Sequence, residues 1–262
     1  MNTSELRTYL NEAAELYNQP SFIENDPISI PHAFQCLQDI EIMGFWTAML
    51  AWGQRVTIIN KARELVRLMG HQPYEFILHH KEKDRKAFLD FKHRTFNATD
   101  TLYFLEFLQW WYRENESLES AFTHKLAPDA PHVGDALTGF HELFFSLDHA
   151  PARTRKHVAT PARKSSCKRL NMFLRWMVRR DDKGVDFGLW KNIQPSQLLI
   201  PMDVHVDRVA RRLGLLTRKQ RDFRAVLELT DSLRAFDPDD PVRYDFSLFG
   251  IGVLEKNRAA GQ

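Results

Sequence analysis

Hydrophobic residues recur with the period of the α-helix along almost the whole chain, and this pattern restricts the fold more than any other feature. The clearest stripe, near the N-terminus, consists of Leu6, Tyr9, Leu10, Ala13, Leu16 and Tyr17. Further helical patterns cover residues 40–52, 56–69, 99–112, 117–126, 135–148, 167–180, 203–215, 217–235 and 240–254. No segment shows the alternation of β-branched residues or the Asn-Gly turn that is typical of hairpins. The sequence therefore predicts an all-α protein.

The composition excludes several classes of protein. With 44% hydrophobic and 27% charged residues, the chain has enough apolar material for a core. No apolar run reaches the roughly 18 residues that cross a bilayer, and the N-terminal segment lacks the pattern of a secretory signal. The two cysteines, Cys36 and Cys167, are too few for a disulfide framework, a Cys₄ zinc site or a four-cysteine iron–sulfur cluster. We therefore expect a soluble, cytoplasmic protein with no membrane contact, metal, cofactor or iron–sulfur cluster.

Positive charge is concentrated in two stretches, although the formal net charge is only +2. Between residues 151 and 180 there is no Asp or Glu, and the basic residues are Arg153, Arg155, Lys156, Arg163, Lys164, Lys168, Arg169, Arg175, Arg179 and Arg180. Between residues 208 and 224 the single acid Asp222 accompanies Arg208, Arg211, Arg212, Arg218, Lys219, Arg221 and Arg224. Clusters of this kind indicate a nucleic-acid partner more strongly than the net charge does.

The helical pattern that starts near Lys168 has two different faces. Its apolar stripe consists of Leu170, Phe173, Leu174, Met177 and Val178. The opposite side carries Lys168, Asn171, Arg175 and Arg179. We expect the helix to bury the first face and to expose the second. Lys168 falls in the first turn, where free backbone N–H groups favour an anion such as phosphate.

Asp203 stands directly before the helical pattern that Gly214 ends. Its residue type and place predict an N-cap, whose carboxylate accepts hydrogen bonds from the first turn and stays ionised. Taken separately, the basic face and the capping Asp are also explained by a solvated helix surface and an ordinary cap.

Together the two segments resemble the helix–hairpin–helix DNA glycosylases, the superfamily of endonuclease III and the 8-oxoguanine glycosylases. The segment IPMDVHVDRVARRLGL (200–215) is similar to their VDTHV-type segment, and SSCKRLNMFLRWMVR (165–179) resembles the signature of a bacterial branch of the superfamily. LAWGQRVTIINKA (50–62) is similar to the early helix pair whose Gln approaches DNA, and residues 236–254 are similar to the closing helix. The resemblance implies that Lys168 is the nucleophile, that Asp203 is its partner and that Gln54 lies near DNA.

The same resemblance implies a two-lobed fold with the site in the cleft between the lobes. A helical barrel would cover residues 38–195, and the second lobe would combine residues 1–37 with residues 196–262. The hairpin before the Lys departs from the family pattern, which usually reads LPGVG and lets glycine amides touch a phosphate. Here the stretch is ATPARKSSC, so either its side chains replace those amides or the hairpin is remodelled. The expected phosphate contacts are Arg163, Lys164, Ser165, Ser166, Arg169, Arg175 and Arg179.

The implied function is base-excision repair, in which a DNA N-glycosylase removes a modified base and then cleaves the abasic site as a lyase. This chemistry needs an amine nucleophile and a carboxylate beside the sugar. The cations Arg169, Arg175 and Arg179 would favour the neutral form of a Lys168 amine. Two alternatives remain open: a non-catalytic nucleic-acid-binding protein of the same fold, and a monofunctional glycosylase that uses Asp203 only. The expected partner is duplex DNA with a damaged base or an abasic site.

Overall fold

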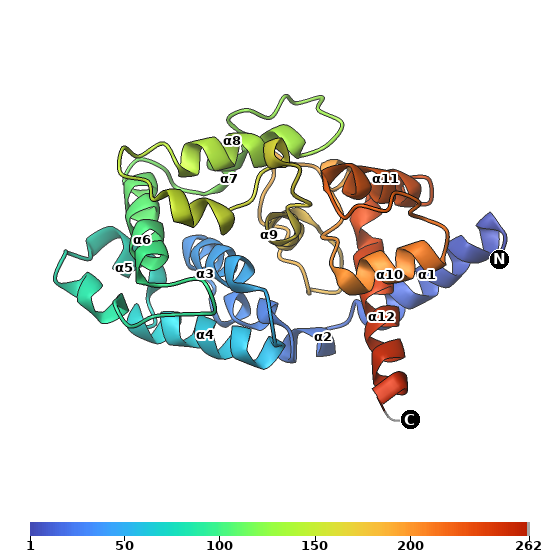
Figure 1. Ribbon diagram of the computed structural model, residues 1–262, viewed down its shortest axis with the longest axis horizontal. Helices are drawn as coiled ribbons and strands as arrows, with labels where there is room; N and C mark the ends of the chain where they lie inside the picture. Colours follow the sequence, from blue (N-terminus) through green and yellow to red (C-terminus); the bar gives the residue numbers. More distant parts are fainter. Residues whose placement is uncertain (261–262) are drawn as a thin grey trace. The chain divides into compact units, whose positions relative to one another are not determined.

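The computed structural model describes residues 1–260, with side chains described as far as residue 253. The described chain is helical, and the single extended pairing found in it is an isolated bridge between His93 and Phe96. The predicted all-α class is therefore confirmed. The chain, whose helices are labelled in Figure 1, divides into two compact units. Unit 1 comprises Met1–Phe22, Pro128–Gly134 and Thr160–Gln262, and unit 2 comprises Ile23–Ala127 and Asp135–Ala159.

This division differs from the two lobes expected from the sequence. Residues 160–195, expected in the helical barrel, belong to unit 1, and residues 23–37, expected in the other lobe, belong to unit 2. The first difference follows from α9 (Lys168–Val178), whose Arg175 forms a buried ion pair with Asp245 in unit 1. That ion pair fixes α9 to the C-terminal helices.

Unit 1 is built around its last helix, α12. Its helices are α1 (Thr3–Tyr17), α9, α10 (Val204–Arg212), α11 (Phe223–Arg234) and α12 (Tyr244–Ala260), with the short 3₁₀ helices η5 (Pro161–Arg163), η6 (Pro195–Gln197) and η7 (Pro241–Arg243). The Ser247 hydroxyl in α12 donates to the carbonyl of Leu10 in α1, at 2.6 Å. A Cβ at Gly250 would lie 2.2 Å from Cδ2 of Tyr17, so this close approach of α1 and α12 requires glycine.

Unit 2 has an aromatic core. Its helices are α3 (Leu37–Leu50), α4 (Arg55–Leu68), α5 (Pro73–His79), α6 (Ala98–Tyr112), α7 (Glu119–Thr123) and α8 (Gly134–Phe144), with the 3₁₀ helices η1 (Pro27–Ser29), η2 (Pro31–Ala33), η3 (Asp84–Phe88) and η4 (Ala152–Lys156). The short α2 (Ser21–Glu24) lies where the chain passes from unit 1 to unit 2. Phe45 of α3 stacks on Phe104 of α6, with ring centroids 5.4 Å apart. Buried Glu41 accepts hydrogen bonds from the Tyr112 hydroxyl at 2.8 Å and the Leu118 N–H at 3.0 Å, which satisfies its carboxylate inside the core.

The basic stretch around residues 149–159 is anchored within unit 2 by Asp100 of α6. The Thr154 hydroxyl donates to Asp100 Oδ1 at 2.7 Å, Arg153 pairs with Oδ2, and His157 Nε2 lies 3.4 Å from Oδ2. Thr154 and His157 are buried. Although this stretch contains proline and is rich in basic residues, its contacts with Asp100 hold part of it in the core of unit 2.

Candidate active site

A tight hairpin leads into α9 and places Lys168 at the first position of that helix. Lys164 (φ 61°) and Cys167 (φ 50°) both adopt left-handed conformations, which side chains other than glycine rarely allow. The Lys164 carbonyl accepts a hydrogen bond from the N–H of Phe223 at 3.2 Å, and Asn171 Nδ2 donates to the Ser166 carbonyl at 3.1 Å. The hairpin therefore makes left-handed turns without glycine, and hydrogen bonds within unit 1 hold it.

The same hairpin presents cationic and N–H groups to solvent. The side chains of Arg163 and Lys164 are exposed, and neither has a partner among the described residues. Within the described chain, the backbone N–H groups of Ser165 and Ser166 also have no hydrogen-bond acceptor. Cations and consecutive free N–H groups at a helix N-terminus form an arrangement that binds phosphate.

Lys168 and Arg169 occupy the first turn of α9 and are half-buried. Lys168 Nζ lies 3.5 Å from Met172 Sδ, one turn further along the helix. Burial lowers the pKa of Arg169 to about 10, which leaves its guanidinium charged at neutral pH. Burial also raises the pKa of the Cys167 thiol to about 12, so that this thiol stays protonated and is a poor nucleophile.

Asp203 caps α10, and the predicted N-cap is confirmed. Its Oδ1 accepts hydrogen bonds from the backbone N–H groups of His205 at 2.8 Å and Val206 at 2.9 Å. The side chain is half-buried, and no described residue donates a hydrogen bond to its second oxygen, Oδ2. The cap thus fixes the carboxylate and leaves one oxygen available.

Asp245, in the first turn of α12, connects the two predicted catalytic residues. Burial raises its pKa to about 6; the charge of Arg175 lowers it, that of Asp203 raises it further and that of Lys168 lowers it. Charges change a neighbour's pKa strongly only over short distances. The charges of Lys168 and Asp203 thus both act on this one buried carboxyl group, within unit 1.

Arg175 and Arg179, in contrast, are structural. Their residues are only 4% and 3% exposed. Arg175 Nε donates to Asp186 Oδ1 at 3.2 Å, and its Nη1 pairs with Asp245. The carboxylates that pair with Arg179 are those of Asp181, Asp186 and Asp240. The prediction that α9 exposes a basic face is wrong, because carboxylates from other segments surround these arginines. Their burial argues against the expected phosphate contacts and removes two of the three cations expected to favour a neutral Lys168.

Gln54 lies in unit 2, at the N-cap position of α4, where its side chain is exposed and has no partner among the described residues. The preceding Gly53 (φ 107°) is covered by Arg94, since a Cβ at Gly53 would lie 2.8 Å from Arg94 Nη1. Arg94 is itself exposed and left-handed (φ 55°). The sequence did not reveal this arginine over Gly53, because one Arg in a loop between Phe91 and Phe96 carries no periodic signal.

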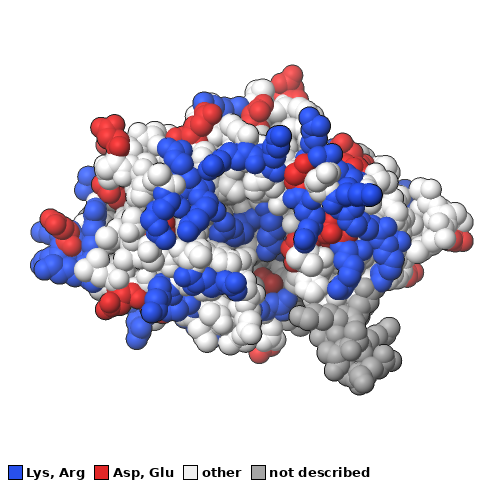
Figure 2. All heavy atoms as spheres, viewed as in Figure 1, with Lys and Arg blue, Asp and Glu red and all other residues white. Residues whose placement is uncertain are grey.

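Lys and Arg side chains also gather over α10 and α11, where Asp and Glu side chains lie among them (Figure 2). Asp207 Oδ1 pairs with Arg211 at 2.8 Å, and Asp222 Oδ2 pairs with Arg218 at 2.5 Å. The second basic stretch of the sequence is therefore partly neutralised by acids four residues away along the chain.

In the part of the chain that the structure describes, no group of three or more His, Cys, Asp or Glu side chains could hold a metal ion. No described helix is both long enough and apolar enough to pass through a membrane. A family model described as "Protein of unknown function (DUF2400)" matches residues 26–254. Comparisons with curated proteins and with solved structures gave no match.

Proposed function

We propose that this chain, which belongs to the DUF2400 family of proteins of unknown function, binds DNA and excises a modified base through Lys168 and Asp203. The observation that carries the proposal is that Lys168 begins α9 and Asp203 caps α10, and that both charges act on buried Asp245. Asp203 is fixed as a helix cap with one oxygen available. Lys168 begins a second helix, and its charge, like that of Asp203, acts on the carboxyl group of Asp245. An amine and a carboxylate held by rigid helix ends are the pair that covalent N-glycosidic cleavage requires.

In the proposed reaction the nitrogen of a neutral Lys168 amine bonds to the sugar carbon C1′ that carries the base. The bond from C1′ to the base breaks, and the base departs with the bonding electron pair and takes up a proton. The Asp203 carboxylate stabilises the positive charge that develops on the sugar, and it accepts a proton from the attacking amine. The C1′–O4′ bond of the sugar then breaks, the nitrogen lone pair forms the C1′=N bond of a protonated imine, and O4′ takes up a proton and becomes a hydroxyl. Loss of a proton from C2′ then expels the 3′ phosphate by β-elimination.

The hairpin before α9 supports the DNA-binding part of the proposal. Arg163 and Lys164 are exposed cations, and the N–H groups of Ser165 and Ser166 have no acceptor in the described chain. Neutralising phosphates in this way releases counterions, so DNA affinity should fall steeply with salt. Arg169, the next residue on α9, also stays charged at neutral pH.

Two alternatives use the same residues differently. In a monofunctional glycosylase, the available oxygen of Asp203 activates a water molecule and Lys168 only binds phosphate. In a non-catalytic protein, the hairpin binds nucleic acid and neither residue takes part in chemistry. Both alternatives predict salt-sensitive DNA binding, and neither predicts a covalent enzyme–DNA intermediate.

Borohydride trapping tests the proposal, because reduction turns an imine into a stable amine. The natural chain is incubated with duplex DNA that carries an abasic site or 8-oxoguanine, alongside Lys168→Gln, Asp203→Asn and, as a matched lysine control, exposed Lys219→Gln. We expect an adduct with the natural chain and with Lys219→Gln, but none with Lys168→Gln.

The other outcomes separate the alternatives. Base release that survives Lys168→Gln but not Asp203→Asn would indicate the monofunctional enzyme. Trapping that survives Lys168→Gln would assign the chemistry to another amine. DNA binding without trapping or base release on either substrate would favour the non-catalytic protein.

A further inference from the structure

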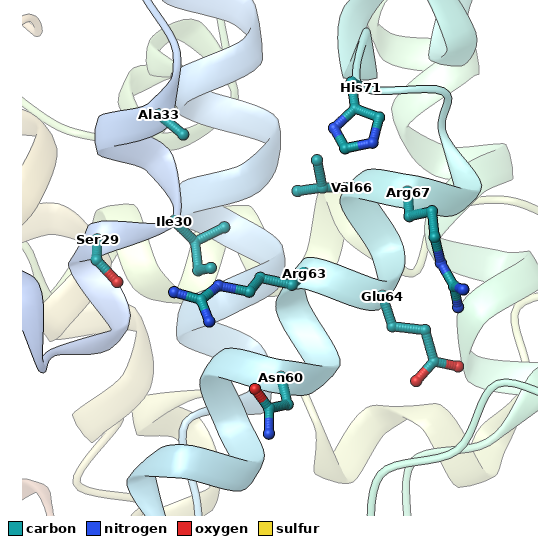
Figure 3. A pocket seen from close by; sticks show the side chains of 9 residues that line it. All are labelled: Ser29, Ile30, Ala33, Asn60, Arg63, Glu64, Val66, Arg67 and His71. Atoms are coloured by element: carbon teal, nitrogen blue, oxygen red, sulfur yellow. The ribbon is translucent and has the colours of Figure 1, made fainter.

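A hollow of about 680 Å³ lies in unit 2, between one face of α4 and the short helices η1 and η2 (Figure 3). Hollows of this size accommodate small organic ligands. It contains none of the residues of the proposed DNA chemistry, so a ligand bound there would require a separate explanation.

Arg63 gives the hollow its charge. Its side chain extends from α4 toward Ser29 and Ile30, whereas Arg67 and Glu64 leave the helix on the other side (Figure 3). Glu64 is engaged by Lys61, whose Nζ lies 2.6 Å from Glu64 Oε2. No described residue forms an ion pair or hydrogen bond with Arg63. The hollow therefore holds a cation with no counter-charge from the described chain.

Two neutral polar groups next to Arg63 also lack partners. The hydroxyl of Ser29 is buried without a hydrogen-bond partner, and in Figure 3 it is turned toward the Arg63 guanidinium. The carboxamide of Asn60, one turn before Arg63 on α4, is exposed to solvent and has no partner among the described residues, so the cost of burial applies to the Ser29 hydroxyl. A buried polar atom without a partner is costly, and a ligand oxygen would remove that cost.

The other end of the hollow has a flat, largely apolar wall. Gly70 (φ 63°) and His71 (φ 60°) are two successive left-handed residues, and the His71 N–H donates to the Val66 carbonyl at 2.9 Å. This turn ends α4 and carries the His71 ring over Val66 (Figure 3). Val66 and Ala33 complete the wall.

We propose that this hollow binds a phosphoryl group carried on a flat, largely apolar body, as in a nucleotide. The guanidinium of Arg63 matches phosphate in a bidentate fashion, and Ser29 and Asn60 supply donors for the remaining oxygens. The base of the nucleotide packs against Val66 and the ring of His71. The phosphoryl group comes either from a free mononucleotide or from a DNA strand, and these two sources can be separated by experiment.

Isothermal titration calorimetry of the full chain with 2′-deoxyadenosine 5′-monophosphate tests the proposal. Inorganic phosphate and the unphosphorylated nucleoside serve as partial probes. We expect Arg63→Gln to weaken binding of the nucleotide by about tenfold or more, since it removes a charged hydrogen-bonding group. The matched control Arg113→Gln, at an exposed position after α6, should leave binding unchanged. Ser29→Ala should weaken binding without lowering Tm, because it removes a hydroxyl that has no partner; a purely structural Ser29 would lower Tm instead.

Undamaged duplex DNA provides the second arm. If the mononucleotide does not bind but Arg63→Gln weakens DNA binding relative to Arg113→Gln, the phosphoryl group belongs to a DNA strand and the site stands. If no probe binds, or if every probe binds Arg63→Gln as it binds the natural chain, the proposal is overturned. Neither arm requires base release or trapping, so its failure is distinguishable from a failure of the Lys168 chemistry.

Discussion

The guanidinium of Arg175 pairs with the carboxylate of Asp245 and joins α9 to α12 inside unit 1. Asp186 accepts a second hydrogen bond from the same guanidinium at 3.2 Å, and the ring of Phe246 lies 4.5 Å from Arg175 Cζ. The arginine is thus enclosed by two carboxylates and an aromatic face. Lys168, two turns earlier on α9, consequently lies on a helix that is held in place by the buried ion pairs of Arg175.

Replacing Arg175 by Met should lower the free energy of unfolding by about 3–5 kcal/mol, because Asp186 and Asp245 lose a buried partner. Urea denaturation monitored by circular dichroism measures the change. The matched substitution Arg224→Met, on the exposed surface of α11, should change stability by less than about 0.5 kcal/mol. Equally small effects at both positions would contradict a structural role for Arg175.

The raised pKa of Asp245 predicts a pH dependence of stability. Because burial raises this pKa from 3.8 to about 6, the folded protein holds the proton more tightly than the unfolded chain does. The resulting stabilisation is fully present below pH 4 and is lost as the pH rises through 6, a loss of about 3 kcal/mol. Urea denaturation between pH 4 and pH 7.5 should show this slope in the natural chain but not in Asp245→Asn. The same slope in both proteins would show that Asp245 does not cause it.

The lowered pKa of Asp100 predicts that the free energy of unfolding rises with pH, in a lower pH range than for Asp245. Burial alone would raise its pKa, but the neighbouring His157 side chain and hydrogen bonds from the Asn97 N–H and the Thr154 hydroxyl hold it at about 2. The stability that it contributes is present above pH 3.8 and is lost as the pH falls through 2.

Substituting Asp100 should release the stretch that it anchors. We expect Asp100→Asn to accelerate tryptic cleavage after Arg153, Arg155 and Lys156 at least tenfold, since a loss of about 1.4 kcal/mol in local stability already multiplies the open population by ten. Mass spectrometry of the fragments measures the rate. The exposed control Asp148→Asn should be cleaved like the natural chain.

Lys164 should contribute one phosphate contact if the hairpin before α9 binds DNA. Lys164→Gln is then expected to reduce the slope of log K against log salt concentration by about 1. Fluorescence anisotropy with a labelled duplex at several salt concentrations gives the slope. Lys86→Gln, an exposed control in unit 2, should leave it unchanged, and an equal change in both variants would point to diffuse charge effects.

The close approach of Gly250 to Tyr17 predicts that a side chain at position 250 of α12 lowers stability as long as Tyr17 is present. Gly250→Ala should destabilise unit 1 by about 1–3 kcal/mol, because the new Cβ overlaps the tyrosine ring. In a Tyr17→Ala background the same change should be neutral or stabilising, since alanine favours the helix by about 1 kcal/mol over glycine. Thermal unfolding of the four proteins measures the coupling, and additive effects would exclude it.

Features set by neighbouring residues were predictable from the sequence. The cap at Asp203 depends on the next three residues, and the buried character of α3 follows from its continuous apolar run. The environment of Arg179 was not predictable, because its partner Asp240 lies in a distant segment and a helical wheel counts every arginine as solvated. The neighbourhood of Gln54 and Arg94 was hidden for the same reason, since a loop contact leaves no periodic trace.

The conformation of the hairpin before Lys168 could not be predicted from the sequence alone. Without glycine, the sequence left open whether side chains replace backbone amides or the hairpin is remodelled. The structure shows left-handed turns at Lys164 and Cys167, and it exposes the side chains of Arg163 and Lys164. Left-handed conformations at residues with a Cβ are costly by about 1–2 kcal/mol each, so the surrounding hydrogen bonds must hold them.

The buried, protonated thiol of Cys167 makes the natural chain selective toward thiol reagents. A maleimide reacts with an accessible thiolate, and Cys167 offers neither access nor thiolate near neutral pH. Cys36 is exposed and lies three positions after Ala33, which lines the hollow in unit 2. We therefore expect a maleimide dye to attach at Cys36 alone and to report occupancy of the hollow without any substitution in the protein.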